Sequence, residues 1–497
     1  MTTKTTTLRK RIVIIACAVL SLLGLTSAVG ADENQPNIVY ILADDMGYGD
    51  VSYLNKDSKI HTPNLDQLAK AGMIFTDAHS GSAVCTPTRY GILTGRYCWR
   101  SRLKKGVLNG NSPHLIEDGR MTAASILKPQ GYHTACIGKW HLGLDWQKKP
   151  GAPREIDYTQ SVQHGPTTNG FDYSFIIPAS LDMAPYVYLE NDKVTAIPDR
   201  VVASSGGKKK WRKGPIGSDF KHIEVLPKIT EKAVSYIDQR AEGKKPFFLY
   251  FPLPAPHTPI LPTEEFQGKS GTNEYGDFVL QVDWTVGQVM KALKRHGLEE
   301  NTLIIFTSDN GCSPKADFAE LETFDHDPSY IFRGHKADIF EGGHHIPFIT
   351  RWPARIQGGS TCADTICLTD LMATAADITG YTLPNNAGED SVSFLPDLLG
   401  TATAPVREAT VHHSINGSFS IRQGKWKLEL CPGSGGWSDP KPGSAQAKQL
   451  PAIQLYDLSS DIGETTNVQD RHPDVVKRLT ALLQEYKDSG RSTPKRQ

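Results

Sequence analysis

Short apolar runs rich in β-branched and aromatic residues recur along this chain, and helix-like stretches lie between several of them. Such runs are typical of strands that are buried on both faces. Strands that alternate with helices favour an α/β fold with a large, mainly parallel sheet flanked by helices. The expected strands are residues 37–42, 133–137, 246–251, 303–307 and 346–350, and the expected helices are residues 64–71, 121–128, 223–239, 277–296 and 369–379.

The pattern changes after about Gly400, where a small α+β domain with an antiparallel sheet and a terminal helix is expected. Its predicted elements are a hairpin at residues 419–430, a long Gly-, Pro- and Ser-rich loop at residues 432–443, a strand at residues 454–458 and a helix at residues 473–486. We therefore divide the chain into a leader over residues 1–31, a main domain over residues 32–400 and a C-terminal domain over residues 401–497.

The leader has the layout of a secretory signal peptide. Four cationic residues precede a mostly apolar run from Ile12 to Val29, and we place the cleavage site after Ala31 because small residues surround it. A retained membrane anchor is the alternative, but the run is near the lower length for a bilayer span. We expect a secreted or periplasmic protein without a stable membrane anchor.

Charge and cysteine content narrow the possible partners. Without the leader, 50 Lys and Arg residues stand against 54 Asp and Glu residues, and this balance argues against a nucleic acid partner. Besides Cys17 and Cys85, six cysteines remain. That number does not make a disulfide scaffold in a chain of this length, and export permits pairing without proving it.

The first motif that carries chemistry is centred on Cys85, which precedes Pro87 by two positions and Arg89 by four. Pro87 suits a first helical turn, so residue 85 would lie at a helix N-terminus, where free N–H groups and the dipole favour an anion. A buried structural cysteine is the alternative. The motif resembles the Cys-x-Pro-x-Arg signature of formylglycine-dependent (type I), arylsulfatase-like sulfatases of the alkaline-phosphatase-like superfamily. In that family a formylglycine-generating enzyme oxidises the cysteine to an aldehyde.

A second motif lies at residues 131–143 and resembles the other signature of these sulfatases over its whole length. Lys139 and His141 flank one residue just beyond an expected strand, so in extended backbone both side chains would point to the same side. A surface lysine and a core histidine are the alternative. Two signatures in the family's order strengthen the resemblance, which extends from residue 36 to about residue 490.

A metal site is expected from Asp44 and Asp45, which follow the first strand, and from Asp309 and Asn310, which follow the strand at residues 303–307. Open α/β sheets build their sites at the carboxyl ends of strands. Side-chain oxygens without histidine suit a hard cation, Ca²⁺ or less well Mg²⁺, and argue against zinc. Acids in loops often only cap helices; the resemblance favours one Ca²⁺ per chain, with residue 85 as a further ligand.

Three further segments resemble family positions that contact the sulfate. They contribute His257, Lys336 and Ser180, the last on a short match. Two departures from the family pattern stand out: Thr88 replaces the commonest serine, and His344 with His345 replaces an arginine, which we expect to alter substrate contacts. Residues 206–213 offer cations and Trp211 to a sulfated glycan, although an exposed loop explains such a run more simply.

The resemblance implies hydrolysis of a sulfate monoester to an alcohol and inorganic sulfate. One hydroxyl of the hydrated aldehyde would attack sulfur while Ca²⁺, Lys139 and Lys336 neutralise the sulfate oxygens and Arg89 orients residue 85. His257, with Lys336, would protonate the leaving alcohol. His141 would then take the proton of the second hydroxyl, so that sulfate leaves and the aldehyde returns. We expect a sulfated small molecule or glycan, and most of all a sulfated carbohydrate, as the substrate.

Two kinds of alternative remain open. A phosphatase, phosphodiesterase or phosphonate hydrolase of the same superfamily shares much of this site, and two Zn²⁺ per chain with a Ser or Thr nucleophile would favour the first two. A catalytically silent glycan-binding relative would result if Cys85 is never oxidised. Metal content and substrate profiling separate these possibilities.

Overall fold

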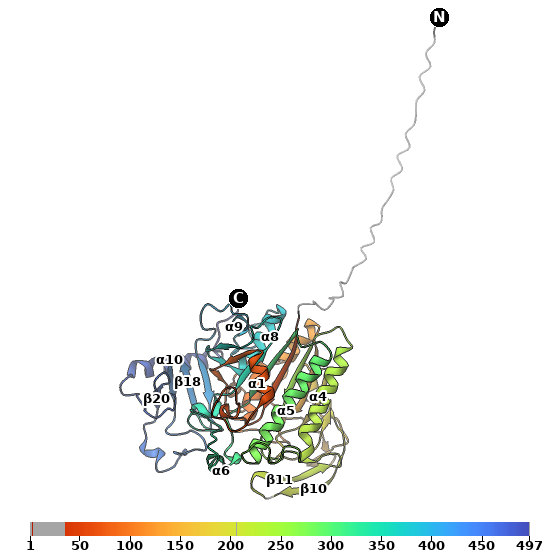
Figure 1. The fold of residues 1–497 in the computed structure, drawn as a ribbon, viewed down its shortest axis with the longest axis horizontal. Coiled ribbons are helices and arrows are strands. Elements are labelled where there is room, and N and C mark those ends of the chain that lie inside the picture. The colour runs from red at the N-terminus through yellow and green to blue at the C-terminus, as the bar shows by residue number, and fades with distance from the viewer. Residues whose placement is uncertain (1, 3–34, 205, 497) are drawn as a thin grey trace.

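The computed structural model describes residue 2, residues 35–204 and residues 206–496 (Figure 1). Apart from residue 2, the predicted signal peptide lies outside these residues. Across the described chain the largest sheet has ten strands. In spatial order they are β15 (Ser360–Cys362), β2 (Met73–Phe75), β14 (Phe348–Arg351), β13 (Thr302–Ser308), β1 (Asn37–Ala43), β12 (Phe247–Pro252), β4 (His133–Lys139), β7 (Tyr173–Ile177), β8 (Leu189–Glu190) and β9 (Lys193–Val194).

The centre of this sheet is parallel. β1 pairs in parallel with β13 and β12, β12 with β4, and β4 with β7. β14 runs antiparallel to β13, and β8 antiparallel to β7. The expectation of a mainly parallel sheet is therefore confirmed for the five central strands, while the flanking strands make the sheet mixed. All five strands expected from the apolar runs form, with boundaries shifted by two residues or less.

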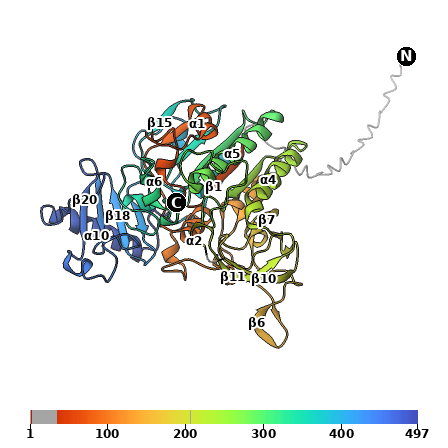
Figure 2. The ribbon, with the colours of Figure 1, turned by 60° about the horizontal axis from the view of Figure 1, so that its bottom comes forward.

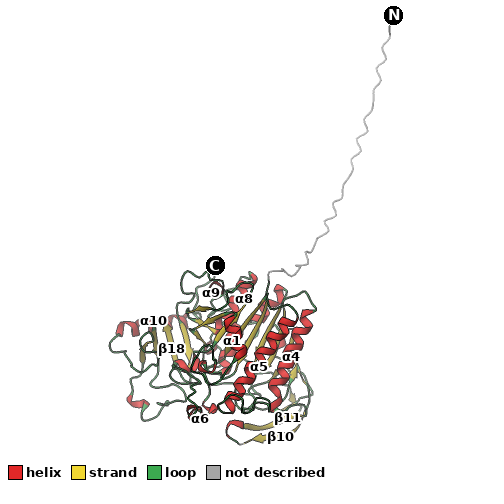
Figure 3. Ribbon diagram, viewed as in Figure 1, coloured by secondary structure: helices red, strands yellow, loops and turns green. Residues whose placement is uncertain are grey.

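Helices cover both faces of the sheet (Figure 3). Alternate residues of β1 enter two separate hydrophobic cores: Val39 and Ile41 join one, and Tyr40 and Leu42 the other. The first core is closed by α1 (Pro63–Lys70), α4 (Val225–Ala241) and α5 (Glu274–Arg295), and the second by α2 (Cys85–Thr94), α3 (Ala123–Leu127) and α8 (Leu371–Thr379). Because β1 is buried on both faces, its apolar run has no polar alternation.

The C-terminal part forms a smaller unit at one side of the molecule, coloured blue in Figures 1 and 2. A four-stranded antiparallel sheet packs against α10 (Pro473–Asp488) through Leu479 and Leu483. The strands are β17 (Thr410–His413), β18 (Phe419–Gln423), β19 (Trp426–Glu429) and β20 (Gln454–Asp457). The expected hairpin, strand and helix are confirmed, β17 was not predicted from the sequence, and the division after residue 400 stays a prediction.

Small elements complete the fold. The hairpin of β10 (Pro198–Ser204) and β11 (Trp211–Gly217) projects at the lower edge of Figure 1. Within the expected loop at residues 206–213, residues 206–210 thus form the tip of a hairpin, and residues 211–213 begin β11. The remaining elements are β3 (Ala78–His79) paired with β16 (Ile366–Cys367), β5 (Lys148–Lys149) paired with β6 (Ala152–Ile156), α6 (Phe318–Glu322), α7 (Glu341–His344) and α9 (Leu395–Leu398).

Among the described residues, no helix combines the length and the apolar character that a membrane crossing requires. The seven cysteines in this part of the chain are all free thiols.

Candidate active site

The carboxyl ends of the central parallel strands meet at one edge of the sheet, and the predicted site residues come from there. Asp44 and Asp45 follow β1, Lys139 ends β4, and Asp309 follows β13. His257 follows β12 by five positions. The strand order β13-β1-β12-β4 therefore brings residues that are up to 265 positions apart in sequence into contact.

Cys85 is the first residue of α2 and follows Val84, whose backbone is extended. The helix starts here because Pro87 fits the first turn and Thr88 directs its hydroxyl back to Ser82 O at 3.0 Å and Val84 O at 3.2 Å. Burial raises the pKa of the Cys85 thiol, although the charges of Lys139 and Lys336 oppose this shift. The side chain is therefore a protonated thiol at the wall of a cavity, which is a poor nucleophile as it stands.

Arg89 lies one turn further along α2 and is fully buried. Its Nε and one terminal nitrogen donate to Asp309 Oδ2 at 3.0 Å and 2.8 Å, and its other terminal nitrogen donates to Lys139 O at 2.9 Å. Asp44 Oδ1 lies 3.8 Å from the same guanidinium. Arg89 thus joins α2 to the ends of β1, β4 and β13.

Two buried lysines contact the aspartate pair after β1. Lys139 Nζ donates to Asp44 Oδ2 at 2.5 Å, and Lys336 Nζ lies 2.6 Å and 2.7 Å from the two oxygens of Asp45. Burial would raise the pKa of Asp44, but Lys139, His257, Arg89 and Lys336 together lower it well below its usual range. Burial lowers the pKa of Lys336, but Asp45, Cys85 and Asp44 together raise it above its usual range. Asp44 and Lys336 are therefore charged in the folded protein.

Two oxygens in this cluster have no hydrogen-bond partner among the described residues: Asp44 Oδ1 and Asn310 Oδ1. Asn310 is held through its amide nitrogen, which donates to Asp45 Oδ1 at 2.8 Å. Burial and the neighbouring charge of Asp44 raise the pKa of Asp309 to about 7. Unpartnered oxygens beside mutually repelling carboxylates fit a hard divalent cation. Such a cation would bind the unpartnered oxygens and would reduce the repulsion between the carboxylates. The donor set thus fits the expected calcium ion.

His257 lies beside the same acids. Its Nδ1–H donates to Thr258 O at 2.5 Å, which leaves Nε2 facing Asp45 Oδ2 at 3.5 Å. Ligand atoms of His257, Asp44 and Asp45 lie within 4.8 Å of one another, so the histidine belongs to the charged cluster. His257 also lines the cavity together with Cys85, as an acid acting on a bound substrate must.

His141 and Ser180 are the remaining predicted residues. His141 is fully buried, and its Nε2–H donates to Leu108 O at 2.8 Å, so the neutral ring has its lone pair on Nδ1, which has no partner in the described chain. Burial, with the charges of Lys139 and Arg89, lowers the pKa of His141 well below its usual range. Ser180 lines the cavity, and its Oγ is likewise without a partner among the described residues.

The backbone around these residues takes unusual conformations. Asp45, His141 and Ala337 have φ values of 67°, 54° and 81°, which lie in the left-handed region that non-glycine residues rarely adopt. In β4, Gly138 approaches β12 so closely that a Cβ would lie 2.0 Å from Pro252 O. Such strain collects where side chains must be aimed at a common point, and each of these residues is a predicted site residue or its neighbour in sequence.

The cavity above this cluster has a volume of about 740 Å³. Its wall contains residues that the sequence did not indicate: Asp182, Met183, Lys315, Trp437 and Lys441. Trp437 and Lys441 belong to the Gly-, Pro- and Ser-rich loop of the C-terminal part, where no hydrophobic period or motif marks them. Lys210, Trp211 and Arg212 from the β10–β11 hairpin also line the cavity, so the cationic run is more than an exposed loop.

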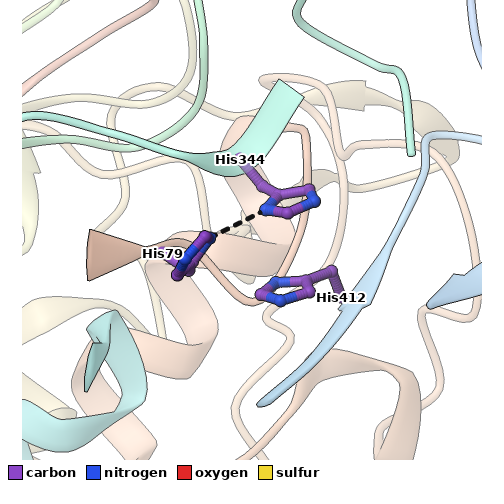
Figure 4. Close-up of side chains that lie close together, drawn as sticks. All are labelled: His79, His344 and His412. Carbon is purple, nitrogen blue, oxygen red and sulfur yellow. Dashed lines mark hydrogen bonds between the residues drawn. The ribbon is translucent and has the colours of Figure 1, made fainter. Parts of the chain in front are cut away.

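His344 and His345 do not line this cavity, and the expectation that they alter substrate contacts was wrong. Their short helix turns them into a buried histidine cluster with His79 and His412 (Figure 4). His79 Nδ1 lies 3.1 Å from His344 Nδ1, and the rings of His344 and His412 stack with centroids 3.9 Å apart and planes 6° apart. Because in-plane lone pairs of parallel rings do not converge on one ion, this arrangement is a packing contact between the main domain and β17.

Known proteins resemble this chain in sequence and in fold. The family model described as Sulfatase matches residues 36–381. The sequence is 36% identical to an N-acetylgalactosamine-6-O-sulfatase of Bacteroides thetaiotaomicron, over 92% of this chain and 94% of that protein, and 33% identical to arylsulfatase A of Bos taurus, over 93% and 91%. A solved structure that is described as part of the metabolism of multiple glycosaminoglycans by Bacteroides thetaiotaomicron has 35% sequence identity to this chain and a TM-score of 0.80. The match covers 92% of this chain and 100% of that one.

Proposed function

Because this chain belongs to the sulfatase family and is a sulfuric ester hydrolase, we propose that it releases sulfate from a sulfated carbohydrate through formylglycine at position 85. The observation that carries the proposal is the position of Cys85 in the cavity wall, beside two buried lysines and a cluster of acids with unpartnered oxygens. A thiol held in this position is a weak nucleophile, whereas the hydrate of an aldehyde offers two hydroxyls. The 6-O-sulfate of N-acetylgalactosamine is the first substrate to test, because a 36% identical relative is named for it.

We assign the calcium site to Asp44, Asp45, Asp309 and Asn310, with residue 85 as a further ligand. Their side chains supply only oxygen donors, which suit Ca²⁺ better than a transition metal. Calcium, when bound, supplies positive charge beside the sulfate oxygens. Lys139 pairs with Asp44, and Lys336 pairs with Asp45. Because calcium would then share the charge of these aspartates, the two ammonium groups would also be able to contact the sulfate.

The other side chains either orient the reacting groups or transfer protons. Arg89 holds Asp309 and the end of β4 in position relative to residue 85. His257, whose Nε2 faces the acids from the cavity wall, would protonate the leaving alcohol, assisted by Lys336. His141 would accept a proton at Nδ1, because burial keeps the ring neutral and its Nε2–H is already engaged. Ser180, which lines the cavity, would donate its hydroxyl hydrogen to a substrate oxygen.

Maturation and location complete the proposal. Cys85 requires a formylglycine-generating enzyme as a partner during synthesis. The predicted signal peptide would direct the chain through export, with cleavage after Ala31, to a secreted or periplasmic location.

The test is a screen of sulfate release from defined sulfated monosaccharides and from a chromogenic aryl sulfate, with Cys85→Ala as the inactive control. Mass spectrometry of the peptide that contains residue 85 should show a loss of about 18 Da relative to cysteine. High activity from protein that contains only unmodified cysteine would contradict the proposed nucleophile. Cleavage of phosphate esters in preference to sulfate esters would contradict the substrate class.

A further inference from the structure

The cavity has a strongly cationic wall. Five of its lining residues carry a positive charge (Lys210, Arg212, Lys315, Lys336 and Lys441), against one carboxylate, Asp182. Asp182 pairs with Arg212 at 2.8 Å, and Lys336 contacts Asp45 below the wall. The three other lysines remain as uncompensated charge.

Lys210, Lys315 and Lys441 are exposed, and their ammonium groups have no hydrogen-bond or carboxylate partner among the described residues. The neighbouring Lys208 behaves differently, because it contacts Glu274, Asp317 and Glu320. Acids are therefore available near this hairpin, yet they neutralise a lysine that does not line the cavity. Like charges that line one cavity repel each other unless an anion binds between them.

The cations lie at two depths. Cys85 and Lys336 are buried, with 2% and 5% of their surface exposed, and they form the floor. The three unpaired lysines are exposed, so we take their side of the cavity as its entrance, and they come from separate segments: the β10–β11 hairpin, the turn after β13 and the C-terminal loop. In Figure 2, α2 lies between the hairpin and the C-terminal unit. The cavity that contains Cys85 therefore also has these three lysines in its wall.

The C-terminal side of this entrance is fixed in place. The carboxylate of Asp338, two positions after Lys336, accepts hydrogen bonds from the backbone N–H groups of Trp437 at 2.7 Å and Ser438 at 3.0 Å. Gly436 packs so tightly that a Cβ would lie 2.3 Å from Ala337 O. The loop that carries Lys441 and the exposed indole of Trp437 is thus anchored to the segment that positions Lys336.

We propose that Lys210, Lys315 and Lys441 form a second anion subsite, which binds a carboxylate or a further sulfate on the sugar next to the one that is desulfated. This inference rests on the proposed sulfatase activity and deepens it, because it names a polyanionic oligosaccharide as the substrate class. The cavity volume is within the range of about 300–1,000 Å³ that is usual for pockets enclosing ligands larger than a single small group. The indole of Trp437 provides an apolar surface beside the cations.

The test compares four substrates: an activated aryl sulfate with a single anionic group, and three disaccharides that carry the same sulfated sugar next to a neutral sugar, a uronate or a second sulfated sugar. We expect kcat/KM to be highest for the uronate or the doubly sulfated disaccharide and to fall with ionic strength. The variant Lys210→Ala/Lys441→Ala should lower this value by about 3- to 20-fold. It should leave turnover of the aryl sulfate and of the neutral disaccharide unchanged.

Lys209→Ala/Lys213→Ala is the matched control, because it removes the same charge from exposed residues of the same hairpin that do not line the cavity. The control should keep the wild-type preference, and Lys441→Arg should retain most of it. Equal kcat/KM for neutral and anionic disaccharides, or equal losses in the two double variants, would overturn the subsite while leaving sulfatase activity intact. Failure to release sulfate from all four substrates would overturn the proposed function and the subsite together. Preference for the uronate over the second sulfate, or the reverse, identifies which anion the subsite takes.

Discussion

The guanidinium of Arg89 donates two hydrogen bonds to a single oxygen of Asp309, Oδ2, at 3.0 Å and 2.8 Å. Both side chains are fully buried. Asp309→Ala should therefore reduce the free energy of unfolding by about 3–5 kcal/mol, since it leaves a buried cation with Asp44 as its remaining carboxylate, at 3.8 Å. Asp309→Asn keeps an oxygen in place and should cost less. Urea denaturation of both variants checks this, and equal stability of the alanine variant and the wild type would contradict the structural role.

Calcium binding should depend on Asn310, whose Oδ1 has no protein partner in the described chain. We expect Asn310→Ala to weaken calcium binding by at least about tenfold, because one ligand oxygen and the hydrogen bond to Asp45 are both lost. Isothermal titration of the chelated protein with Ca²⁺ measures this, and Asn301→Ala, outside the site, is the control. Full wild-type turnover after complete removal of calcium would show that the metal is not needed.

His257 and His141 should be separable by the choice of leaving group. If His257 protonates the departing alcohol, His257→Ala should slow the hydrolysis of sugar sulfates far more than that of aryl sulfates, whose phenolate leaves unaided. His141→Ala should slow the later release of sulfate from any substrate and produce a burst of alcohol. Stopped-flow assays of both variants on both substrates decide between the roles. Equal losses for His257→Ala and no burst for His141→Ala would mean that the roles are misassigned.

The cluster of His79, His344 and His412 should make the fold sensitive to acid. Burial lowers the pKa of all three below the usual value of about 6.5, although Asp77 and Glu341 face His79 and raise its pKa in part. The unfolded chain therefore takes up protons first, so stability is complete above about pH 6.5 and is lost as the pH falls toward the folded pKa values. With three such groups, the free energy of unfolding should fall by up to about 4 kcal/mol for each pH unit of acidification.

Urea denaturation between about pH 7.5 and pH 5 measures this slope. His412→Phe removes one of the titrating groups and should flatten the curve, even though it loses the hydrogen bond to Ser80 O. His61→Phe is the control, because His61 is exposed. The same slope in wild type and in His412→Phe would exclude the cluster as the source of the acid sensitivity.

Asp338 should control the mobility of the cavity wall. Asp338→Asn keeps the shape of the side chain but weakens its bonds to the N–H groups of Trp437 and Ser438. Hydrogen exchange at these two amides should become faster, while exchange in β1 stays unchanged. Asp439→Asn changes an acid in the same loop and serves as the control. Unchanged exchange in Asp338→Asn would show that other contacts hold the loop.

The elements that were predicted from the sequence share a pattern that is visible within each segment alone. Strands such as β1 and β13 are buried on both faces, so their apolar runs are visible without knowledge of their neighbours. The residues around Cys85 and Lys139 were identified by motifs, and parallel strand order explains why Asp44 and Asp309 meet. For these residues the fold adds distances and hydrogen bonds to an arrangement that was already expected.

The parts that were missed depend on contacts that are distant in sequence. Nothing in the composition of the C-terminal loop reveals that Asp338 anchors Trp437, because the two residues are 99 positions apart. His344 and His345 were expected near the substrate from their place in the family pattern, yet the four-residue helix α7 directs them to His79 and His412. The lysines of the entrance come from three segments that meet only in the folded protein.

Cys85 and Lys441 line the same cavity although they are far apart in the sequence, so the cavity wall is complete only late in synthesis. After Cys85 has been incorporated, 356 further residues are added up to and including Lys441, which takes on the order of twenty to seventy seconds at about 5–20 residues per second. During that interval the thiol lies in an incomplete chain, accessible to an oxidising enzyme. Once the C-terminal loop has docked, Cys85 is buried in the cavity wall, so the proposed oxidation would have to take place while the chain is still incomplete.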